Sequence, residues 1–191
     1  MKNVILLLTI FLSSVCNSQT NTKMFYDDYV ECYFDNTSGD SLVIYDSIKG
    51  KSILSLKIND KKVRTEWYKI ALKESKNGWA KIENLMIAPE KADSINSKLA
   101  SLFDNWIELK NLKINIADMS LPDSLGVPFY KKPDLNSEIV CKSGKFLKLE
   151  LLDIDGLWAN VSFIHNENKY SGWIERKNQC AYPWTSCPFN P

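Results

Sequence analysis

The feature of this sequence that most constrains its fold is an internal duplication. Residues 106–111 read WIELKN and residues 173–178 read WIERKN, so five of the six positions are identical. Two further blocks match upstream in the same order. They are residues 68–82 with 147–161 and residues 40–45 with 123–130. A repeat of about 70–85 residues has the size of a small domain rather than of a solenoid unit. The chain is therefore predicted to contain two related modules.

Inside each copy the apolar residues alternate with a period of two, as in residues 147–151. This alternation is typical of strands with one buried face. Asn77-Gly78 and Asp155-Gly156 each fall between two such stretches, and both dipeptides favour tight hairpin turns. For units of about 60–70 residues, a small and nearly closed barrel removes exposed strand edges economically. The sequence predicts an all-β chain with two tandem small barrels.

The first copy is longer because of a segment that precedes its closing strand. Residues 89–103 begin with Pro89 and Glu90, which suit the first turn of a helix. The apolar residues that follow fall on one helical face. We expect an amphipathic helix at residues 89–103, inserted into the first module. It would cover a face or an end of the barrel, or alternatively bind a partner.

The N-terminus has the form of a secretory signal peptide. In residues 1–18 a positively charged start precedes an apolar run at residues 4–12, and small or polar residues follow. The apolar run is too short to cross a bilayer as a helix. We expect export, to the periplasm or outside the cell, after cleavage at Ser18. Lipid anchoring through Cys16 is the less favoured alternative, because Val15 stands where lipoprotein signals usually have Gly, Ala or Ser.

The charge of the exported chain bears on its partners. Removing Lys2 with the signal leaves 23 basic residues (24 minus 1) against 23 acidic ones. A neutral chain lacks the basic excess that nucleic acids or anionic membranes require. We therefore expect no nucleic-acid partner and no integral membrane span, and the oligomeric state stays open.

Four cysteines remain after the signal is removed. Cys180 and Cys187 enclose six residues, and their nearness predicts a disulfide that closes a C-terminal tail at residues 181–191. Cys32 and Cys141 lie in different modules. They would either join the modules through a second bridge or remain two separately buried thiols, and both alternatives stay open.

The sequence offers little for catalysis. A Cys–His hydrolase needs a thiol that an adjacent base activates, and no motif places Cys32 or Cys141 beside His165, which we expect at a hairpin tip. One histidine cannot build the usual zinc sites. Residues 153–156 read as a hairpin turn rather than as a calcium loop. We predict a protein that is not an enzyme, with no catalytic residues, metal or cofactor.

Three motifs of the second copy point to a family resemblance. Residues 127–140 (VPFYKKPDLNSEIV), 155–159 (DGLWA) and 171–174 (SGWI) resemble bacterial SH3-like domains. The first copy departs from the pattern at Asn105, where the family usually has Gly before the closing Trp, and by its insertion. The predicted modules are residues 26–112 and 113–180.

The resemblance implies a non-catalytic binding protein of the cell envelope that recognises peptidoglycan or an envelope protein. Aromatic side chains on a shallow surface can stack on sugars or peptides. The candidate ligand-binding residues are Tyr45, Trp79, Tyr130 and Trp158. Trp106 and Trp173, which open the closing strands, are expected to fill the barrel cores. The alternative function is an interaction or inhibitor protein that docks on a secreted enzyme through residues 89–103.

Three short Asp-Ser-apolar motifs begin at Asp40, Asp93 and Asp123. They resemble an acceptor for O-glycosylation in some exported bacterial proteins. The first and third are equally well explained as a turn that the duplication repeats, so glycosylation stays open.

Overall fold

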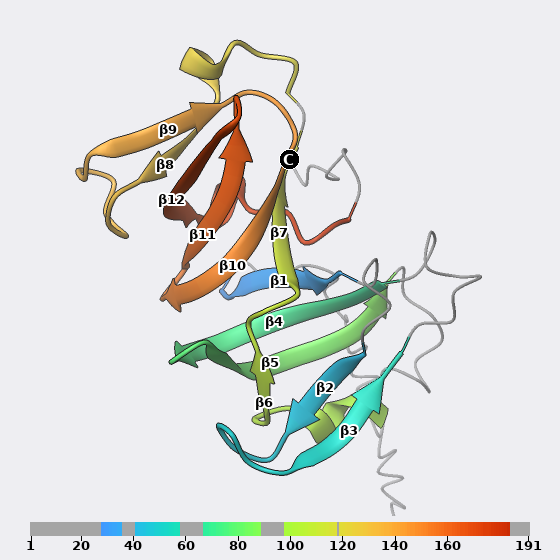
Figure 1. The fold of residues 1–191 in the computed structure, drawn as a ribbon. Helices are drawn as coiled ribbons and strands as arrows, with labels where there is room; N and C mark the ends of the chain where they lie inside the picture. The colour runs from blue at the N-terminus through green and yellow to red at the C-terminus, as the bar shows by residue number, and fades with distance from the viewer. Residues whose placement is uncertain (1–27, 36–40, 58–66, 89–97, 118, 184–191) are drawn as a thin grey trace, which may run out of the picture.

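The computed structural model describes residues 28–35, 41–57, 67–88, 98–117 and 119–183. These residues form twelve strands in one sheet, and every strand pair is antiparallel. The predicted all-β class is confirmed. In Figure 1 strands β1–β6 form the lower part of the molecule and β8–β12 the upper part, and β7 runs from one part to the other.

The described chain has the following elements in order. The strands of the first half are β1 (Val30–Phe34), β2 (Leu42–Tyr45), β3 (Ser52–Leu56), β4 (Trp67–Lys76), β5 (Trp79–Ala88) and β6 (Trp106–Glu108). Those of the second half are β7 (Leu112–Ile116), β8 (Val127–Tyr130), β9 (Ile139–Ser143), β10 (Leu147–Asp155), β11 (Trp158–His165) and β12 (Asn168–Glu175). Short 3-10 helices are η2 (Ala100–Leu102), η3 (Asp123–Leu125) and η4 (Arg176–Asn178).

The duplication in the sequence is also a duplication of strand pairing. The order is β3-β2-β6-β5-β4-β1 in the first half and β9-β8-β12-β11-β10-β7 in the second, so each strand corresponds to the one six numbers later. The halves meet where β1 pairs with β7, with Tyr33 opposite Lys113 and Phe34 opposite Leu112. Equivalent strands therefore form the junction between equivalent halves.

The pairing is continuous across the two halves. Among the described residues, β3 and β9 stand at the two ends of one strand order, and no strand pair closes either half into a ring of its own. The prediction of two tandem small barrels is not supported by this pairing. Instead, the buried side chains of both halves form one core cluster that continues across the β1–β7 junction.

The two predicted hairpins are confirmed, with different turn geometry. Asn77 and Gly78 both have positive φ, +52° and +79°, which is the pattern of a type I′ turn. In the second half Gly156 has a φ of +55° as the first residue of the turn between Asp155 and Trp158, the glycine position of a type II′ turn. Both turns match the right-handed twist of their strands, so they fix equivalent registers.

The closing strands correct one prediction about the core. Trp106 and Trp173 are half-buried rather than core residues, and the fully buried positions belong to Ile107 and Ile174. Successive residues of a strand point to opposite faces, so only one of each Trp-Ile pair can face the core. The branched, smaller isoleucine takes that place in both halves.

A buried charged cluster joins the second half to the first. Glu31 on β1 is 1% exposed, and its Oε2 lies 3.0 Å from Lys69 Nζ on β4. Arg176 Nη2, from η4 of the second half, donates to the same oxygen over 2.8 Å. Two cations thereby compensate the desolvation of one carboxylate. Arg176 is also the single position at which the repeated six-residue motif differs, because Leu109 stands there in the first half.

The segment after η4 packs over the same junction. Cys180 and Asn115 exchange two backbone hydrogen bonds of 2.9 and 2.8 Å. Trp67 Nε1 donates to the Ala181 carbonyl over 3.1 Å, and the Trp67 ring lies 5.1 Å from the Tyr182 ring. The end of the second half thus covers strands of the first.

Some predictions fall outside the described residues. The signal peptide at residues 1–18 does, as do residues 89–97 of the expected helix. Of the rest of that segment, residues 98 and 99 are helical and continue into the 3-10 turn η2, so the full helix at residues 89–103 stays a prediction. Cys187 also lies outside, so its bridge to the buried Cys180 stays a prediction. Cys32 and Cys141 are both free thiols, so no disulfide joins these two residues. No helix within the described ranges has the length and apolarity to cross a membrane.

Candidate functional site

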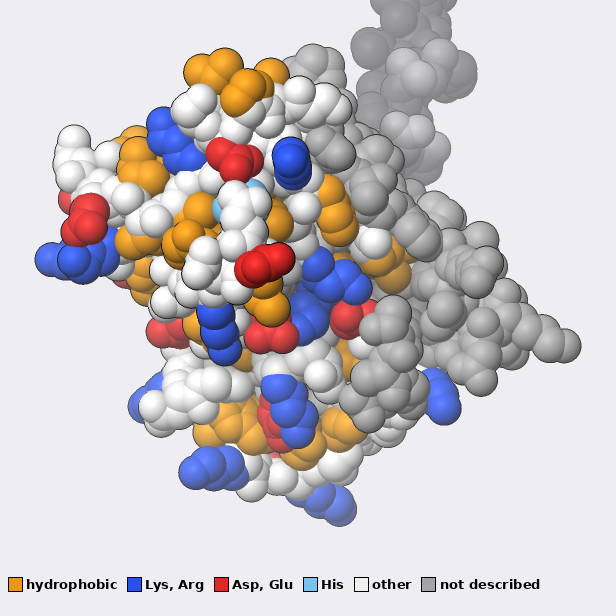
Figure 2. Space-filling view, turned by 45° about the horizontal axis from the view of Figure 1, so that its top comes forward, with side chains coloured by type: hydrophobic (Ala, Val, Ile, Leu, Met, Phe, Trp, Pro, Cys, Tyr) orange, Lys and Arg blue, Asp and Glu red, His pale blue; other side chains and the backbone are white. Residues whose placement is uncertain are grey.

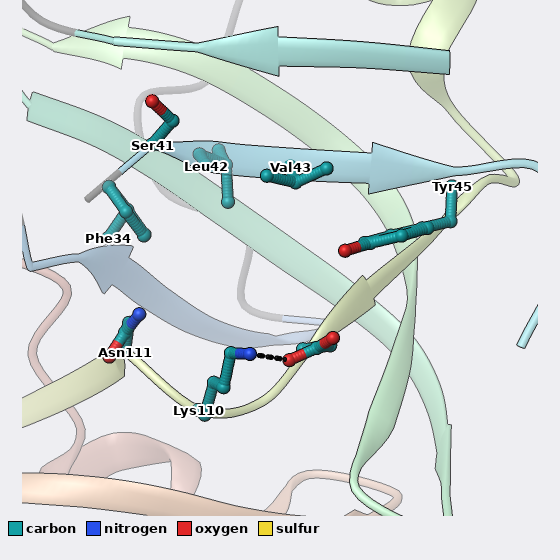
Figure 3. A pocket seen from close by; sticks show the side chains of 8 residues that line it. Phe34, Ser41, Leu42, Val43, Tyr45, Lys110 and Asn111 are labelled. Atoms are coloured by element: carbon teal, nitrogen blue, oxygen red, sulfur yellow. Dashed lines mark ion pairs between the residues drawn. The ribbon is translucent and has the colours of Figure 1, made fainter. Parts of the chain in front are cut away.

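Two small cavities open at equivalent places in the two halves. The first has a volume of about 310 Å³ and lies between β2 and the end of β6 (Figure 3). The second has a volume of about 220 Å³ and lies between β8 and the end of β12. Because β8 corresponds to β2 and β12 to β6, the duplication has produced the same surface hollow twice.

The cavities share four lining residues as well as their place. In the first these are Tyr45, Glu108, Lys110 and Asn111, and in the second Tyr130, Glu175, Lys177 and Asn178. The strand supplies the tyrosine, and the repeated six-residue motif supplies the other three. In Figure 3 the Tyr45 ring reaches from β2 toward the side of the cavity where Lys110 and its acidic partner lie.

Each tyrosine is held by a tryptophan at the edge of its cavity. The rings of Tyr45 and Trp79 lie 4.9 Å apart at 83°, and those of Tyr130 and Trp158 lie 5.5 Å apart at 87°. These edge-to-face geometries are the favoured ones for aromatic pairs. The structure therefore brings the four predicted ligand-binding residues together as two equivalent pairs.

These pairs are less open than a stacking surface would be. Trp79 and Tyr130 are buried, and Tyr45 and Trp158 are half-buried. Only the tyrosines line the repeated cavities. The tryptophans act as supports that fix the tyrosine rings, so the broad aromatic face expected from the sequence is reduced to a phenol in each cavity.

Each cavity carries one acidic and one basic side chain. Glu108 forms an ion pair with Lys110, and Glu175 Oε2 lies 2.7 Å from Lys177 Nζ. The hydrogen bond and the charge of Glu175 raise the pKa of Lys177 above its usual range, and Tyr130 adds to this shift. Lys177 is consequently an ammonium group at neutral pH, and each cavity offers a basic and an acidic side chain that form an ion pair.

Charges of both signs are also mixed on one face of the molecule. On the face drawn in Figure 2, Lys and Arg side chains alternate with Asp and Glu, and neither sign forms a continuous area. That face therefore carries no extended patch of one charge.

A third cavity lies between the halves. Its volume is about 610 Å³, and it is bounded by the β4–β5 turn, by residues 108–113 and by residues 150–152 of β10. Trp79 forms part of its wall. Residues 108–111 separate this cavity from the first repeated one, since Glu108, Lys110 and Asn111 line both.

The predictions from sequence missed the polar residues of the repeated cavities. Glu108, Lys110 and Asn111, and their equivalents in the second half, belong to the motif that revealed the duplication. Their identity at positions outside the core was the signal that could have identified them. The prediction from sequence favoured the aromatic residues, because aromatic side chains contribute most of the energy of core and interface packing.

The histidine and the thiols do not form a nucleophilic site. His165 ends β11 just before a turn, as predicted, and its Nε2 lies 2.9 Å from Asp123 Oδ2. Burial, followed by the charge of Asp123, raises the pKa of the half-buried Cys141 thiol. Burial also raises the pKa of Cys32. A catalytic thiol requires a shift in the opposite direction.

Metal binding has no support in the described part of the chain. There, no three side chains of His, Cys, Asp or Glu gather closely enough to hold an ion.

Comparison with known proteins adds little to this picture. No family model and no curated protein matches the chain. Among solved structures, NlpC2 from Trichomonas vaginalis matches with 15% identity and a TM-score of 0.32, over 87% of this chain and 52% of that protein. The chain thus spans about half the length of that protein. A match at this identity and TM-score supports no inference about this chain.

Proposed function

We propose that this chain is an exported, non-catalytic binding protein of the cell envelope. In this proposal its two halves act as SH3-like modules, and the two repeated cavities are its ligand sites. The ligand is peptidoglycan or an envelope protein. The observation that carries the proposal is the repetition of Tyr, Glu, Lys and Asn around equivalent cavities.

The two copies differ where a purely structural repeat could be expected to agree. At one pair of equivalent core positions stand Ile44 and Phe129, and at another stand Ile70 and Leu149. All four side chains are buried. Hydrophobic cores tolerate such exchanges when the volume is adjusted nearby. Core packing has therefore not kept these positions alike.

The lysines are identical although stability gives little reason for it. Lys110 is 73% exposed and Lys177 66% exposed. An exposed ion pair contributes about 0–1 kcal/mol to folding. Identity at exposed charged positions that line a cavity is better explained by a shared ligand than by folding.

Two equivalent sites on one chain favour a repetitive ligand. After the first site engages a polymer, the second meets the next unit at a high effective concentration, provided that both can reach it. Peptidoglycan offers such repeated units. This supports a polymer of the envelope over a single small molecule as the physiological ligand.

The test is co-sedimentation of the purified chain, without residues 1–18, with purified sacculi. We expect the wild-type chain to be retained and the double variant Lys110→Met, Lys177→Met to lose most of that retention. Methionine keeps the packing of the aliphatic stem and removes the charge. Lys131→Met is the matched control. Lys131 forms an exposed ion pair with Glu138, 2.9 Å long, and lines neither cavity.

Equal retention of the double variant and the wild type would contradict the proposed sites. Absence of retention by the wild-type chain would contradict peptidoglycan as the ligand. Turnover of sacculi by the purified wild-type chain would overturn the non-catalytic reading.

A further inference from the structure

The ligand chemistry of the repeated cavities can be followed in the second one, which Tyr130, Glu175, Lys177 and Asn178 line. Glu175 and Lys177 are two residues apart and pair over 2.7 Å. We propose that each repeated cavity binds a zwitterionic group, an ammonium and a carboxylate that one ligand unit of about the size of a small peptide carries close together. This inference rests on the proposed function only in taking the cavities as the ligand sites.

The resident ion pair can be exchanged for contacts with such a ligand. Lys177 is 66% and Glu175 25% exposed, so water already screens their attraction. Pairs of this kind contribute about 0–1 kcal/mol, and opening one costs little. A ligand carboxylate then accepts from Lys177 Nζ while a ligand ammonium donates to Glu175, so both protein charges stay paired.

The same arrangement discriminates against ligands with one charge. A lone anion would gain Lys177 but would leave Glu175 close to it, and a lone cation would gain Glu175 but meet Lys177. Repulsion from the unused charge is a common source of specificity. A balanced ligand is the only charged one that satisfies both side chains at once.

The remaining walls fit a small ligand with a short aliphatic part. Tyr130 and Asn178 offer a hydroxyl and an amide, which can both donate and accept hydrogen bonds. Val127 and Pro128 supply apolar surface. At about 220 Å³ the cavity is smaller than the usual range for drug-sized ligands, about 300–1,000 Å³. It accommodates a group of dipeptide size.

The first cavity repeats this chemistry in a larger space. Glu108 pairs with Lys110, and Tyr45 and Asn111 occupy the places of Tyr130 and Asn178. The volume is about 310 Å³ rather than 220 Å³. Both cavities should bind the same zwitterionic group, and the first should accept the bulkier substituent on it.

The test is an NMR titration of the full exported chain with three ligands: glycylglycine, N-acetylglycylglycine and glycylglycinamide. Glycylglycine has both charges, and the other two lack the ammonium or the carboxylate. We expect saturable shifts of the Lys177 and Asn178 amides with glycylglycine. Each blocked ligand should bind at least about tenfold more weakly, since a lost charged hydrogen bond costs about that much.

The variant Glu175→Gln sharpens the test. It should weaken glycylglycine by about tenfold and bring the N-acetylated ligand to the same affinity, because the repulsion is removed together with the attraction. Glu138→Gln is the control and should change neither affinity. Blocked ligands that bind the wild-type chain as tightly as glycylglycine would overturn the inference, as would the lack of a saturable shift at Lys177 and Asn178.

The outcomes separate this inference from the proposed function. Retention on sacculi that depends on Lys110 and Lys177 without glycylglycine binding would refute the zwitterionic ligand and leave the function standing. Glycylglycine binding without retention would refute the polymer and leave the zwitterion site standing.

Discussion

The two halves of this protein share their strand pairing and their cavities, and they differ in what joins them. Leu109 is 2% exposed and packs in the core, whereas Arg176 at the equivalent position reaches Glu31 of the other half. Equivalent positions on β1 and β7 likewise hold Glu31, which is buried, and Lys113, which pairs with the exposed Glu150. The repeated part carries the sites, and the divergent part fixes how they lie relative to each other.

The largest expected effect tests this junction. Glu31→Ala leaves Lys69 and Arg176 without their shared carboxylate in a buried place. Breaking a buried ion pair from one side costs about 3–5 kcal/mol. We expect a loss of that size in the free energy of unfolding, measured with urea.

An exposed ion pair on the equivalent strand of the second half, between Lys113 and Glu150, is the control for that measurement. Glu150 is 60% exposed and lies 3.2 Å from Lys113. Glu150→Ala should cost no more than about 1 kcal/mol. Similar losses for Glu31→Ala and Glu150→Ala would show that the junction is not special.

The equivalence of the two cores can be tested at the closing strands. Ile107 and Ile174 are both fully buried, so Ile107→Ala and Ile174→Ala should each cost about 2–5 kcal/mol through the cavity left behind. Half-buried Trp106 and Trp173 should cost less when replaced by Ala. A larger loss for either tryptophan in denaturant melts would restore it as the core residue.

A smaller effect is expected when the one divergent position of the motif is made alike. Arg176→Leu removes the hydrogen bond to Glu31 and leaves that carboxylate with Lys69. A hydrogen bond to a charged group contributes about 1.5–3 kcal/mol. We expect a loss in this range by urea unfolding, and an unchanged midpoint would mean that Arg176 does not hold the halves together.

The smallest effect concerns acid stability in the second half. The Gly144 backbone N–H and then the His165 side chain lower the pKa of Asp123. A lowered folded pKa gives stability that is present above the usual carboxyl pKa of about 3.9 and is lost as the pH falls through the folded value. Thermal melts between about pH 5 and pH 2 should therefore fall less steeply for Asp123→Asn than for the wild type. A parallel decline would contradict this linkage.

The fold could be predicted from sequence as far as local chemistry determines it. The duplication and the period-two pattern gave the strands, and Asn77-Gly78 and Gly156 gave the turns. The same pattern could not decide whether Trp106 or Ile107 faces inward, because alternation places them on opposite faces without choosing one. The structure places the isoleucines, Ile107 and Ile174, on the buried face in both halves.

The site was predictable in part for a similar reason. Aromatic content identified the tyrosines, and the repeat aligned their tryptophan supports. The Glu and Lys residues became meaningful only when strand pairing placed them around one cavity. The Arg176–Glu31 contact joins residues 145 positions apart, and no local pattern could indicate it.

The most direct test of the account compares the two cavities one at a time. Retention on purified sacculi should be measured for Lys110→Met, for Lys177→Met and for the double variant, each with Lys131→Met as control. We predict that each single variant weakens apparent binding by a similar factor, about tenfold or more, because loss of one site removes the gain from effective concentration. The double variant should approach background. If one single variant accounted for the whole loss and the other behaved like the wild type, the two halves would not be equivalent binding modules.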